Sequence, residues 1–296
     1  MQKIAVIGAG KWGSALAYAL SQKNEVVITS RTKRELENFV TLEEALSCEY
    51  LIMAIPVQQI STWLKEHFTF SGQKVLVVAK GIEASTGKFL NEIYNEYVPQ
   101  ENIAFLTGPS FAAEVIQALP TALVVNSKNK ELALEFADMF PDFIKGYTSD
   151  DVIGSEIAGA YKNVIAIAAG ICEGLKLGNN AAAALTSRGL VEIARFGKQF
   201  GAQADTFIGL SGAGDLFLTA SSTMSRNFRV GLGLAAGKSQ EKILEELGEV
   251  AEGIGTAYAL HDIAIKHELY LPIAKEVYEM LEGKSPQESL KDLLSK

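Results

Sequence analysis

Short apolar runs alternate with helical patterns over the first half of the chain. The runs are rich in β-branched residues and are bounded by polar residues or glycine, which is typical of buried strands. We expect strands at residues 3–7, 25–29, 50–54, 74–78, 102–106, 122–125 and 143–147, and helices at 57–67, 86–97 and 130–139. A capping box, Thr41 with Glu44, predicts a further short helix. This alternation predicts an α/β Rossmann-type domain with a doubly wound, mostly parallel sheet.

The pattern changes beyond Ser149, where strand signals end and Ala, Gly and Leu recur at helical spacing. We therefore expect an all-helical second domain, with residues 1–149 in the first domain and 150–296 in the second. Its helices are predicted at 151–172, 181–200, 227–236, 240–247, 255–267 and 273–282, and a last one starts at Ser285. Helices rich in Ala and Gly pack closely within a domain or between two subunits, so a homodimer is expected.

Three glycines follow the first predicted strand directly. Gly8, Gly10 and Gly13 precede a pattern of small and apolar residues typical of a helix. In a dinucleotide-binding turn the first glycine allows a sharp bend, the second lets the backbone approach a pyrophosphate, and the third allows close packing of helix on strand. Phosphates bind the N–H groups at such a helix start. Glycine also forms purely structural turns, but the strands and helix around this one favour nucleotide binding.

The composition limits the partners. A net charge of −8 disfavours a nucleic-acid surface, which needs clustered Lys and Arg. Cys48 and Cys172 lie far apart without metal-type spacing, so we expect no disulfide, no metal site and a reducing cytoplasm. No secretion signal is apparent at the start of the sequence. The apolar stretch 157–172 contains Lys162 and Asn163, which favours a buried core helix over membrane insertion.

Polar residues follow two of the predicted strands. Lys80 comes after the 74–78 strand, and Gly108 and Ser110 come after the 102–106 strand. Lys80 could be a solvated turn lysine, and Ser110 an N-cap of the next helix. Ligands of open α/β sheets bind outside the carboxyl ends of the strands, however, so these positions are also candidate ligand contacts.

Lys162 lies inside the apolar helix predicted at 151–172. Lysine is rarely fully buried without a partner, so its ammonium group either reaches the surface or faces a cleft. Gly159 and Ile165 beside it offer little polar surface to follow, which favours the cleft. Desolvation there would lower the pKa of Lys162 toward the range of a general acid or base.

A third group of polar residues follows Gly212. Asp215 and Thr219 are four residues apart and would share one face of a helix. Arg226 and Asn227 open the next predicted helix, where a guanidinium, an amide and backbone N–H groups favour an anion. A capped helix start with a solvated arginine explains the same residues, and the pattern alone does not decide between the two.

Together these stretches resemble the NAD(P)-dependent glycerol-3-phosphate dehydrogenases of the bacterial type. The resemblance runs in order from the first strand to about Pro272, and the ordered set is far more specific than any single motif. Its motifs are Gly8-Ala9-Gly10-Lys11-Trp12-Gly13, Ala79-Lys80-Gly81, Gly108-Pro109-Ser110-Phe111-Ala112, Lys162-Asn163, Gly212-Ala213-Gly214-Asp215, Ser225-Arg226-Asn227-Phe228-Arg229-Val230-Gly231 and Val250-Ala251-Glu252-Gly253.

The resemblance implies reversible hydride transfer between NAD(P)H and C2 of dihydroxyacetone phosphate, which makes glycerol 3-phosphate for phospholipid synthesis. Lys162 matches the lysine that exchanges the proton of the C2 oxygen. The catalytic groups match Lys162, Lys80, Asp215, Thr219 and Asn163. The substrate contacts match Lys80, Gly108, Ser110, Lys162, Asp215, Ser225, Arg226 and Asn227, the last two nearest the phosphate. The cofactor contacts match Gly8, Gly10, Lys11, Trp12, Gly13, Arg31, Lys80, Ala112, Arg226, Val250 and Glu252.

The segment after the second strand departs from the family pattern. Only about ten residues separate that strand from Thr41, whereas family members usually carry a longer insert, so a more open adenosine side is expected. Arg31 stands where an NAD-selective fold has an acidic residue, and an arginine there can accept a 2′-phosphate. NADP is therefore expected at least as readily as NAD.

Two other functions fit parts of the pattern. One is another two-domain NAD(P)-dependent hydroxyacid dehydrogenase, and the other is a non-catalytic protein that senses NADPH. Arg226 and Asn227 discriminate against the first, because only a phosphate-bearing substrate needs them. The combination of Lys80, Lys162 and Asp215 weighs against the second, because a sensor has no use for it.

Overall fold

The computed structural model describes residues 2–36 and 38–295. Met1, Glu37 and Lys296 lie outside the described residues. Met1 and Lys296 are the outer bounds of the two predicted domains, and Glu37 belongs to the short segment before Thr41. By its contacts the described chain divides into two compact units. The first runs to Ala79 and continues over Asn91–Val152, and the second combines Lys80–Leu90 with the residues from Ile153 onward.

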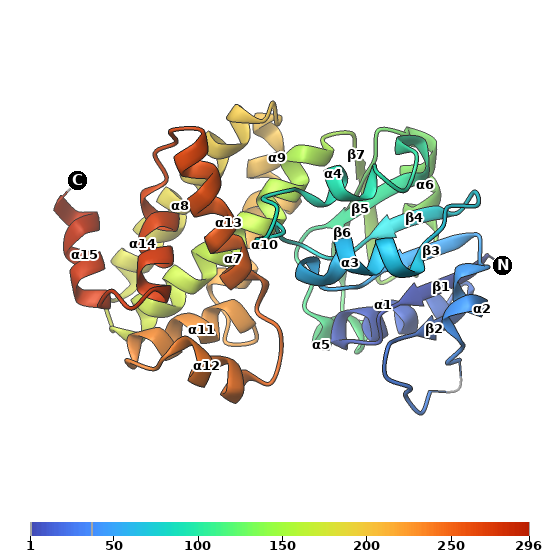
Figure 1. Cartoon of the computed structure of the whole chain (residues 1–296), viewed down its shortest axis with the longest axis horizontal. Coiled ribbons are helices and arrows are strands. Elements are labelled where there is room, and N and C mark those ends of the chain that lie inside the picture. Colours follow the sequence, from blue (N-terminus) through green and yellow to red (C-terminus); the bar gives the residue numbers. More distant parts are fainter. Residues whose placement is uncertain (1, 37, 296) are drawn as a thin grey trace. The chain divides into compact units, whose positions relative to one another are not determined.

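Within the described residues of the first unit, seven strands form one sheet in the order β2-β1-β3-β4-β5-β6-β7 (Figure 1). Neighbouring strands run parallel except for β5 and β6, which are antiparallel. This confirms the predicted doubly wound, mostly parallel sheet, and each strand starts within one residue of its predicted position. The strands are β1 (Lys3–Ile7), β2 (Glu25–Thr29), β3 (Tyr50–Met53), β4 (Lys74–Val77), β5 (Ile103–Thr107), β6 (Thr121–Asn126) and β7 (Ile144–Ser149).

Helices connect these strands and bury the sheet. The helices are α1 (Lys11–Ser21), α2 (Leu42–Leu46), α3 (Val57–His67), α4 (Leu90–Tyr94), α5 (Ala112–Val115) and α6 (Lys130–Asp138). The predicted helix at 86–97 is wrong over its first residues, because Ile82 and Phe89 form an antiparallel bridge and α4 begins only at Leu90. The capping box is confirmed, since the Thr41 hydroxyl accepts a hydrogen bond from the Glu44 amide.

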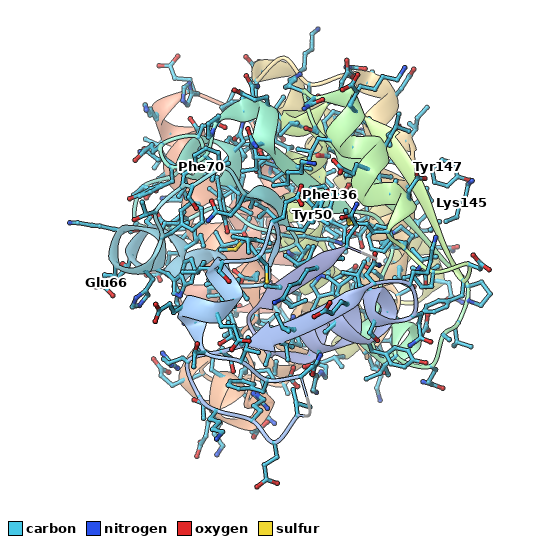
Figure 2. The ribbon with its side chains drawn as sticks, turned by 90° about the vertical axis from the view of Figure 1, so that its right-hand side faces the viewer. Tyr50, Glu66, Phe70, Phe136, Lys145 and Tyr147 are labelled. Carbon is cyan, nitrogen blue, oxygen red and sulfur yellow. The ribbon has the colours of Figure 1, made fainter. Side chains whose placement is uncertain are left out.

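Alternate strand positions supply one apolar cluster of the first unit. Ile4 and Val6 of β1 pack in this cluster with Leu16 of α1 and Phe136 of α6. Phe136 meets the ring of Tyr50 edge-on, with the ring centres 5.9 Å apart (Figure 2). The period-2 alternation of a strand therefore places every second side chain on the face that these helices cover.

The second unit has no strand among its described residues from 153 to 295, which confirms the all-helical prediction. The predicted helices start within three residues of their observed positions, whereas α9, the π-helical turn and α10 were not predicted as separate elements. The elements are α7 (Val152–Gly174), α8 (Asn179–Gln199), α9 (Ala204–Ile208), a π-helical turn η2 (Leu210–Gly214), α10 (Asp215–Ala220), α11 (Arg226–Ala235), α12 (Gln240–Leu247), α13 (Glu252–Lys266), α14 (Pro272–Leu281) and α15 (Pro286–Ser295).

Helix α7 is the most apolar helix of the second unit. It is long and apolar enough to cross a membrane by composition, but 94% of its apolar window is buried inside the protein. Tyr161, Val164 and Ile165 are fully buried in its middle. The expectation of a core helix is therefore confirmed.

A buried carboxylate from α8 caps helix α14. No side chain of the α14 start caps it, and Pro272 supplies no N–H group. Glu192 instead accepts hydrogen bonds from the amides of Ile273 at 3.0 Å and Ala274 at 2.9 Å, and from the Tyr161 hydroxyl at 2.8 Å. One side chain thus joins α7, α8 and the start of α14, where a negative charge is also favoured by the helix dipole.

Replacing Glu192 with Ala should lower the free energy of unfolding by about 3 kcal/mol, because three buried donors lose their acceptor. Urea denaturation followed by circular dichroism measures the loss. Val191→Ala is the control, since that neighbouring side chain is exposed and should contribute less than about 0.5 kcal/mol. Equal losses in the two variants would contradict the capping role.

Candidate active site

The glycine turn after β1 fits a dinucleotide. Gly8 has a φ of +117°, and a Cβ there would lie 2.5 Å from the Ala54 carbonyl oxygen. A Cβ on Gly13 would lie 1.9 Å from the Gly8 carbonyl oxygen. Around Gly10, in contrast, no atom lies within 4 Å of the Cβ position, and no side chain caps the start of α1. Two glycines are therefore required by packing, and the third leaves the space that a pyrophosphate needs.

This turn lies where the strand order reverses. The chain moves from β1 to β2 on one side and later to β3 on the other, so the carboxyl end of β1 is the topological switch point of the sheet. Ligands of such sheets bind there. Arg31 is exposed two residues after β2, whose last residue, Thr29, accepts a hydrogen bond from the Gly8 amide. Lys11 is exposed, and Trp12 packs partly buried on the first unit's core.

The end of β5 supplies the other candidate positions of the first unit. Gly108 is buried in the bend that follows the strand. The alternative that Ser110 is an N-cap is wrong, because α5 begins after Phe111 without a side-chain cap. The Ser110 hydroxyl instead donates a hydrogen bond to the Gly108 carbonyl at 3.2 Å, which closes the bend on itself. Ala112 is the first residue of α5 and packs on the core.

Three charged side chains meet in the interior of the second unit. Asp215 is 1% exposed, and its two oxygens accept hydrogen bonds from different lysines. The Lys162 ammonium donates to Oδ1 at 2.7 Å, and the Lys80 ammonium donates to Oδ2 at 2.8 Å. We call this group the Lys80–Asp215–Lys162 centre. Lys80 is thus no freely solvated turn lysine, and the Lys162 ammonium is paired inside the protein instead of reaching the surface. The cleft expected beside Lys162 stays a prediction.

Thr219 completes the centre from the next turn of α10. Its hydroxyl oxygen accepts a second hydrogen bond from the Lys162 ammonium at 2.7 Å. The spacing of Asp215 and Thr219 does place both on one helix face, as predicted. Directly before Asp215 the chain forms the π-helical turn η2, in which the Gly214 amide donates to the Gly209 carbonyl five residues earlier. Such turns are frequent at functional sites because they re-aim the side chains around them.

The electrostatics of the centre favour loss of a proton from Lys162. Burial is the main reason that the pKa of Lys162 is lowered to about 8; Asp215 opposes the shift, and the positive charges of Lys80 and Arg226 add to it. This confirms the direction predicted from the sequence. Burial alone would raise the pKa of Asp215, but the ammonium groups of Lys162 and Lys80 hold it below its usual value. The centre thus holds a carboxylate that stays charged and an amine near its titration point.

A chain of amide hydrogen bonds begins at Asn163, the residue after Lys162. Asn163, next to Lys162, donates to the Gly159 carbonyl and accepts from the Asn227 side-chain amide at 2.9 Å. The Asn227 oxygen in turn accepts from the Gly253 amide at 3.0 Å. A Cβ on Gly253 would lie 2.7 Å from that oxygen, so only glycine allows the contact. The chain therefore joins α7, α11 and the start of α13.

The start of α11 presents a cation next to a capped helix end. The Ser225 hydroxyl caps the helix by accepting from the Phe228 amide at 3.2 Å. The Arg226 side chain is 43% exposed and lies 3.8 Å from the Glu249 carboxylate. The capped start and the solvated arginine are thus both present, and they leave a guanidinium and a helix start available to an anion. Later in the chain, Val250 is exposed, and Glu252 is the first residue of α13.

The candidate residues divide between the two units. Gly8, Gly10, Lys11, Trp12, Gly13, Arg31, Gly108, Ser110 and Ala112 belong to the first unit, and Lys80, Lys162, Asn163, Asp215, Thr219, Ser225, Arg226, Asn227, Val250 and Glu252 belong to the second. Among the described residues, no group of three or more His, Cys, Asp or Glu side chains is placed to hold a metal ion.

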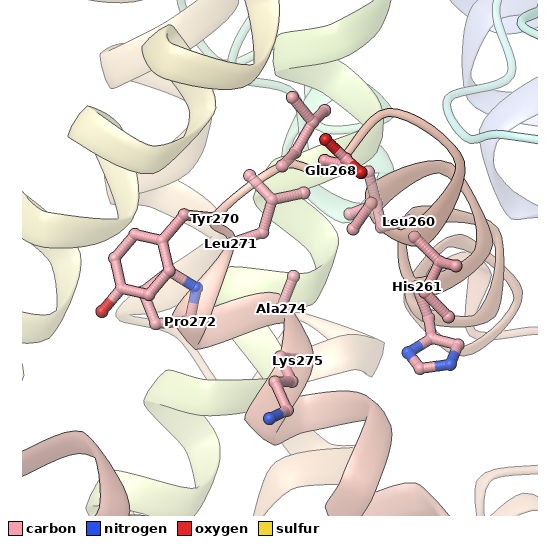
Figure 3. Close-up of a pocket in the computed structure, with 11 residues that line it drawn as sticks. Leu260, His261, Glu268, Tyr270, Leu271, Pro272, Ala274 and Lys275 are labelled. Carbon is pink, nitrogen blue, oxygen red and sulfur yellow. The ribbon is translucent and has the colours of Figure 1, made fainter. Parts of the chain in front are cut away.

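The second unit also contains a pocket that includes none of the candidate residues. It has a volume of about 290 Å³ and lies between α13 and α14, where Leu260, Ala264 and Leu271 line it (Figure 3). No sequence motif pointed to it, because its lining consists of ordinary helix and turn residues.

Comparisons with known proteins give one consistent family. The model described as the NAD-dependent glycerol-3-phosphate dehydrogenase C-terminus matches residues 151–291, and the corresponding N-terminus model matches residues 3–41 and 31–133. Glycerol-3-phosphate dehydrogenase (NAD(P)+) of Sulfurimonas denitrificans is 71% identical over 295 residues and covers 100% of both chains. The enzyme of that name from a Nitratiruptor species is 61% identical, covering 99% of this chain and 98% of the relative.

A solved structure agrees with these sequence matches. The crystal structure of glycerol-3-phosphate dehydrogenase from Coxiella burnetii has a TM-score of 0.91 and 31% sequence identity to this chain, and covers 100% of this chain and 99% of its own. Both units of the fold therefore have counterparts in that enzyme.

Variants of the glycine turn should separate effects on folding from effects on cofactor binding. Gly10→Ala should leave the unfolding temperature almost unchanged but weaken NADPH binding about tenfold or more, because its Cβ enters the space left for the pyrophosphate. Gly13→Ala should cost about 1–3 kcal/mol of stability through overpacking. Thermal unfolding and a fluorescence titration with NADPH measure the two effects. Normal NADPH affinity in Gly10→Ala would refute the assignment of the turn.

Proposed function

The chain belongs to the NAD(P)-dependent glycerol-3-phosphate dehydrogenase family, and on this premise we propose which of its residues carry the reaction. It is an oxidoreductase that acts on a CH–OH group, and it interconverts dihydroxyacetone phosphate and glycerol 3-phosphate with NAD(P)H. When bound, the cofactor supplies the hydride or accepts it. The proposal assigns cofactor binding to residues 1–149 and the substrate chemistry to residues 150–296 together with Lys80.

Lys162 is the proposed general acid and base. In the reductive direction its ammonium group gives a proton to the C2 oxygen of dihydroxyacetone phosphate, and in the oxidative direction its neutral amine takes that proton back. The observation that carries this role is the buried Lys162 ammonium at 2.7 Å from both Asp215 and Thr219, with a pKa lowered by burial to about 8. An acid or base works best when its pKa is near the operating pH.

The neighbours of Lys162 position the amine and stabilise charge. Asp215 and Thr219 fix the direction of the Lys162 ammonium by accepting two of its hydrogen bonds. Lys80 adds a second positive charge, which stabilises the negative charge that develops on the C2 oxygen in the transition state. Asn163 holds the adjacent turn of α7 through its bond to Asn227.

The substrate phosphate is assigned to the start of α11. Arg226 supplies a guanidinium, Asn227 and Ser225 supply polar groups, and the helix start adds its positive dipole end. The ion pair of Arg226 with Glu249 is long, at 3.8 Å, and partly exposed, so a phosphate dianion can replace it at little cost. Gly108 and Ser110 are the proposed substrate contacts from the first unit.

The cofactor contacts are proposed around the glycine turn and the α13 start. Gly8, Gly10 and Gly13 shape the turn for the pyrophosphate, and the exposed Arg31 accepts the 2′-phosphate of NADP, so NADP is used at least as readily as NAD. The further proposed contacts are Lys11, Trp12, Lys80, Ala112, Arg226, Val250 and Glu252.

We extend the proposal to the setting of the enzyme. Its product, glycerol 3-phosphate, is a precursor of phospholipids, which places the enzyme in phospholipid synthesis as in its family. A cytoplasmic homodimer is supported by the two widely separated free cysteines and by exposed alanines, such as Ala183 and Ala184, on α8. The net charge of −8 supports partners other than nucleic acid. The full-length family match outweighs the alternatives of another hydroxyacid dehydrogenase or an NADPH sensor.

Lys162→Ala should lower turnover of dihydroxyacetone phosphate by about a thousandfold or more while NADPH still binds. In the wild type the reductive rate should fall as the pH rises through about 8, and the oxidative rate should rise there, because the two directions need the charged and the neutral amine. Absorbance of NADPH follows both rates. Near-normal turnover in Lys162→Ala would show that another group transfers the proton.

Arg226→Ala should raise the KM for dihydroxyacetone phosphate by about 10- to 100-fold, because a charged hydrogen bond to the phosphate is lost. The KM for NADPH should rise less, because Arg226 is only one of several proposed cofactor contacts. Lys242→Ala removes an exposed cation from the neighbouring helix α12 and serves as the control. An unchanged KM in Arg226→Ala would move the phosphate away from α11.

A further inference from the structure

The segment Lys80–Leu90 belongs to the second unit, although the residues on both sides of it belong to the first. It folds as a short hairpin, in which Ile82 and Phe89 form an antiparallel bridge and the Glu83 amide donates to the Lys88 carbonyl at 3.1 Å. Gly87, with a φ of +68°, forms the turn. We call this segment the 80–90 hairpin.

The hairpin has an ordered interior of its own. The Glu83 side chain is buried and accepts a hydrogen bond from the Thr86 hydroxyl at 2.7 Å. Ile82 and Phe89, on the bridged arms, are also buried and belong to the apolar core of the second unit. Residues 82–89 are therefore fixed by contacts rather than by the covalent chain alone.

An aromatic cluster anchors the hairpin beside the catalytic helix. The Phe89 ring lies edge-on to Phe200, with ring centres 5.3 Å apart, and 6.4 Å from Phe196. Phe196 in turn meets Tyr161 at 5.4 Å, and Tyr161 directly precedes Lys162 in α7. The anchor of the hairpin and the catalytic lysine thus share one packed group of side chains from α7 and α8.

Lys80 lies at the first residue of this anchored segment. Its ammonium group is bound to Asp215 at 2.8 Å, and its methylene groups pass close to Gly159 of α7, 3.5 Å from the Cβ position there. A lysine side chain has several rotatable bonds, so its charge is placed accurately only when its backbone is held. Between Lys80 and Phe89 the hairpin supplies that support.

We propose that the 80–90 hairpin is a positioning element for the reaction, in which the anchored ring of Phe89 holds Lys80 on Asp215 beside Lys162. Phe89 is a positioning residue rather than a catalytic one, because it acts only through Lys80. This inference rests on the proposed roles of Lys80 and Lys162.

Loss of the anchor has a specific electrostatic consequence. The groups that act on the Lys162 charge are Asp215 from α10, Lys80 from the hairpin and Arg226 from α11. If Lys80 moves away, one positive charge near Lys162 is lost, and Lys162 is then the only lysine of the centre paired with Asp215. Both changes favour the ammonium form, so the pKa of Lys162 rises above its value of about 8.

The test compares Phe89→Ala with Val277→Ala by kcat, pH dependence and thermal unfolding. Val277→Ala is the control, since it removes a fully buried apolar side chain from the same core of the second unit but lies on α14, outside the ring cluster of Phe89. Phe89→Ala should lower kcat about tenfold or more and move the fall of the reductive rate to higher pH. Val277→Ala should lose stability but keep the wild-type pH profile. Phe89→Leu should restore most of kcat.

A double-mutant cycle shows whether Phe89 acts through Lys80. In a Lys80→Met background, Phe89→Ala should lower kcat less than about twofold further, because the group it positions is already gone. Multiplicative losses, or equal pH profiles in Phe89→Ala and Val277→Ala, would overturn the proposal. A wild-type profile without a transition near pH 8 would instead refute the role of Lys162, so the two failures are distinguishable.

Discussion

The proposed chemistry of this enzyme depends on a buried carboxylate shared by two ammonium groups. Asp215 lies between Lys162 and Lys80 at 2.7 and 2.8 Å in an almost fully buried site. Buried charges are costly unless they are paired, and here two positive charges share one negative charge. The excess charge and the burial keep Lys162 close to losing its proton, while Asp215 remains ionised. The proposed proton exchange at the substrate oxygen depends on this excess of positive charge.

Three elements bring together the two positive charges and the one negative charge of the centre. The π-helical turn η2 leads directly into Asp215, α7 carries Lys162, and the 80–90 hairpin brings in Lys80. Hydrogen bonds through Asn163 and Asn227 connect the same helix to the start of α11, where the phosphate is assigned. The proposed sites for proton transfer and for the substrate phosphate therefore lie on one set of packed helices, which fixes the distance between them.

Local features were predictable from the sequence, and long-range contacts were not. The strands were predictable because they depend on residues close in sequence, and the glycine turn because its geometry is known. The lowered pKa of Lys162 was predictable because it follows from burial of an apolar helix. The membership of residues 80–90 in the second unit and the capping of α14 by Glu192 depend on contacts between distant residues, such as Glu192 with Ala274. Ser110 illustrates a local failure, because its hydroxyl bonds backward to Gly108 instead of capping α5.

The proposed mechanism depends on the charge of one buried amine, that of Lys162, which can be titrated in the free enzyme. Nuclear magnetic resonance of enzyme labelled with ¹³C at the lysine ε-carbons, with Lys162→Met to assign the signal, follows its protonation without any substrate. We expect a transition at about pH 8. A transition near the ordinary lysine value of about 10.4 would contradict it.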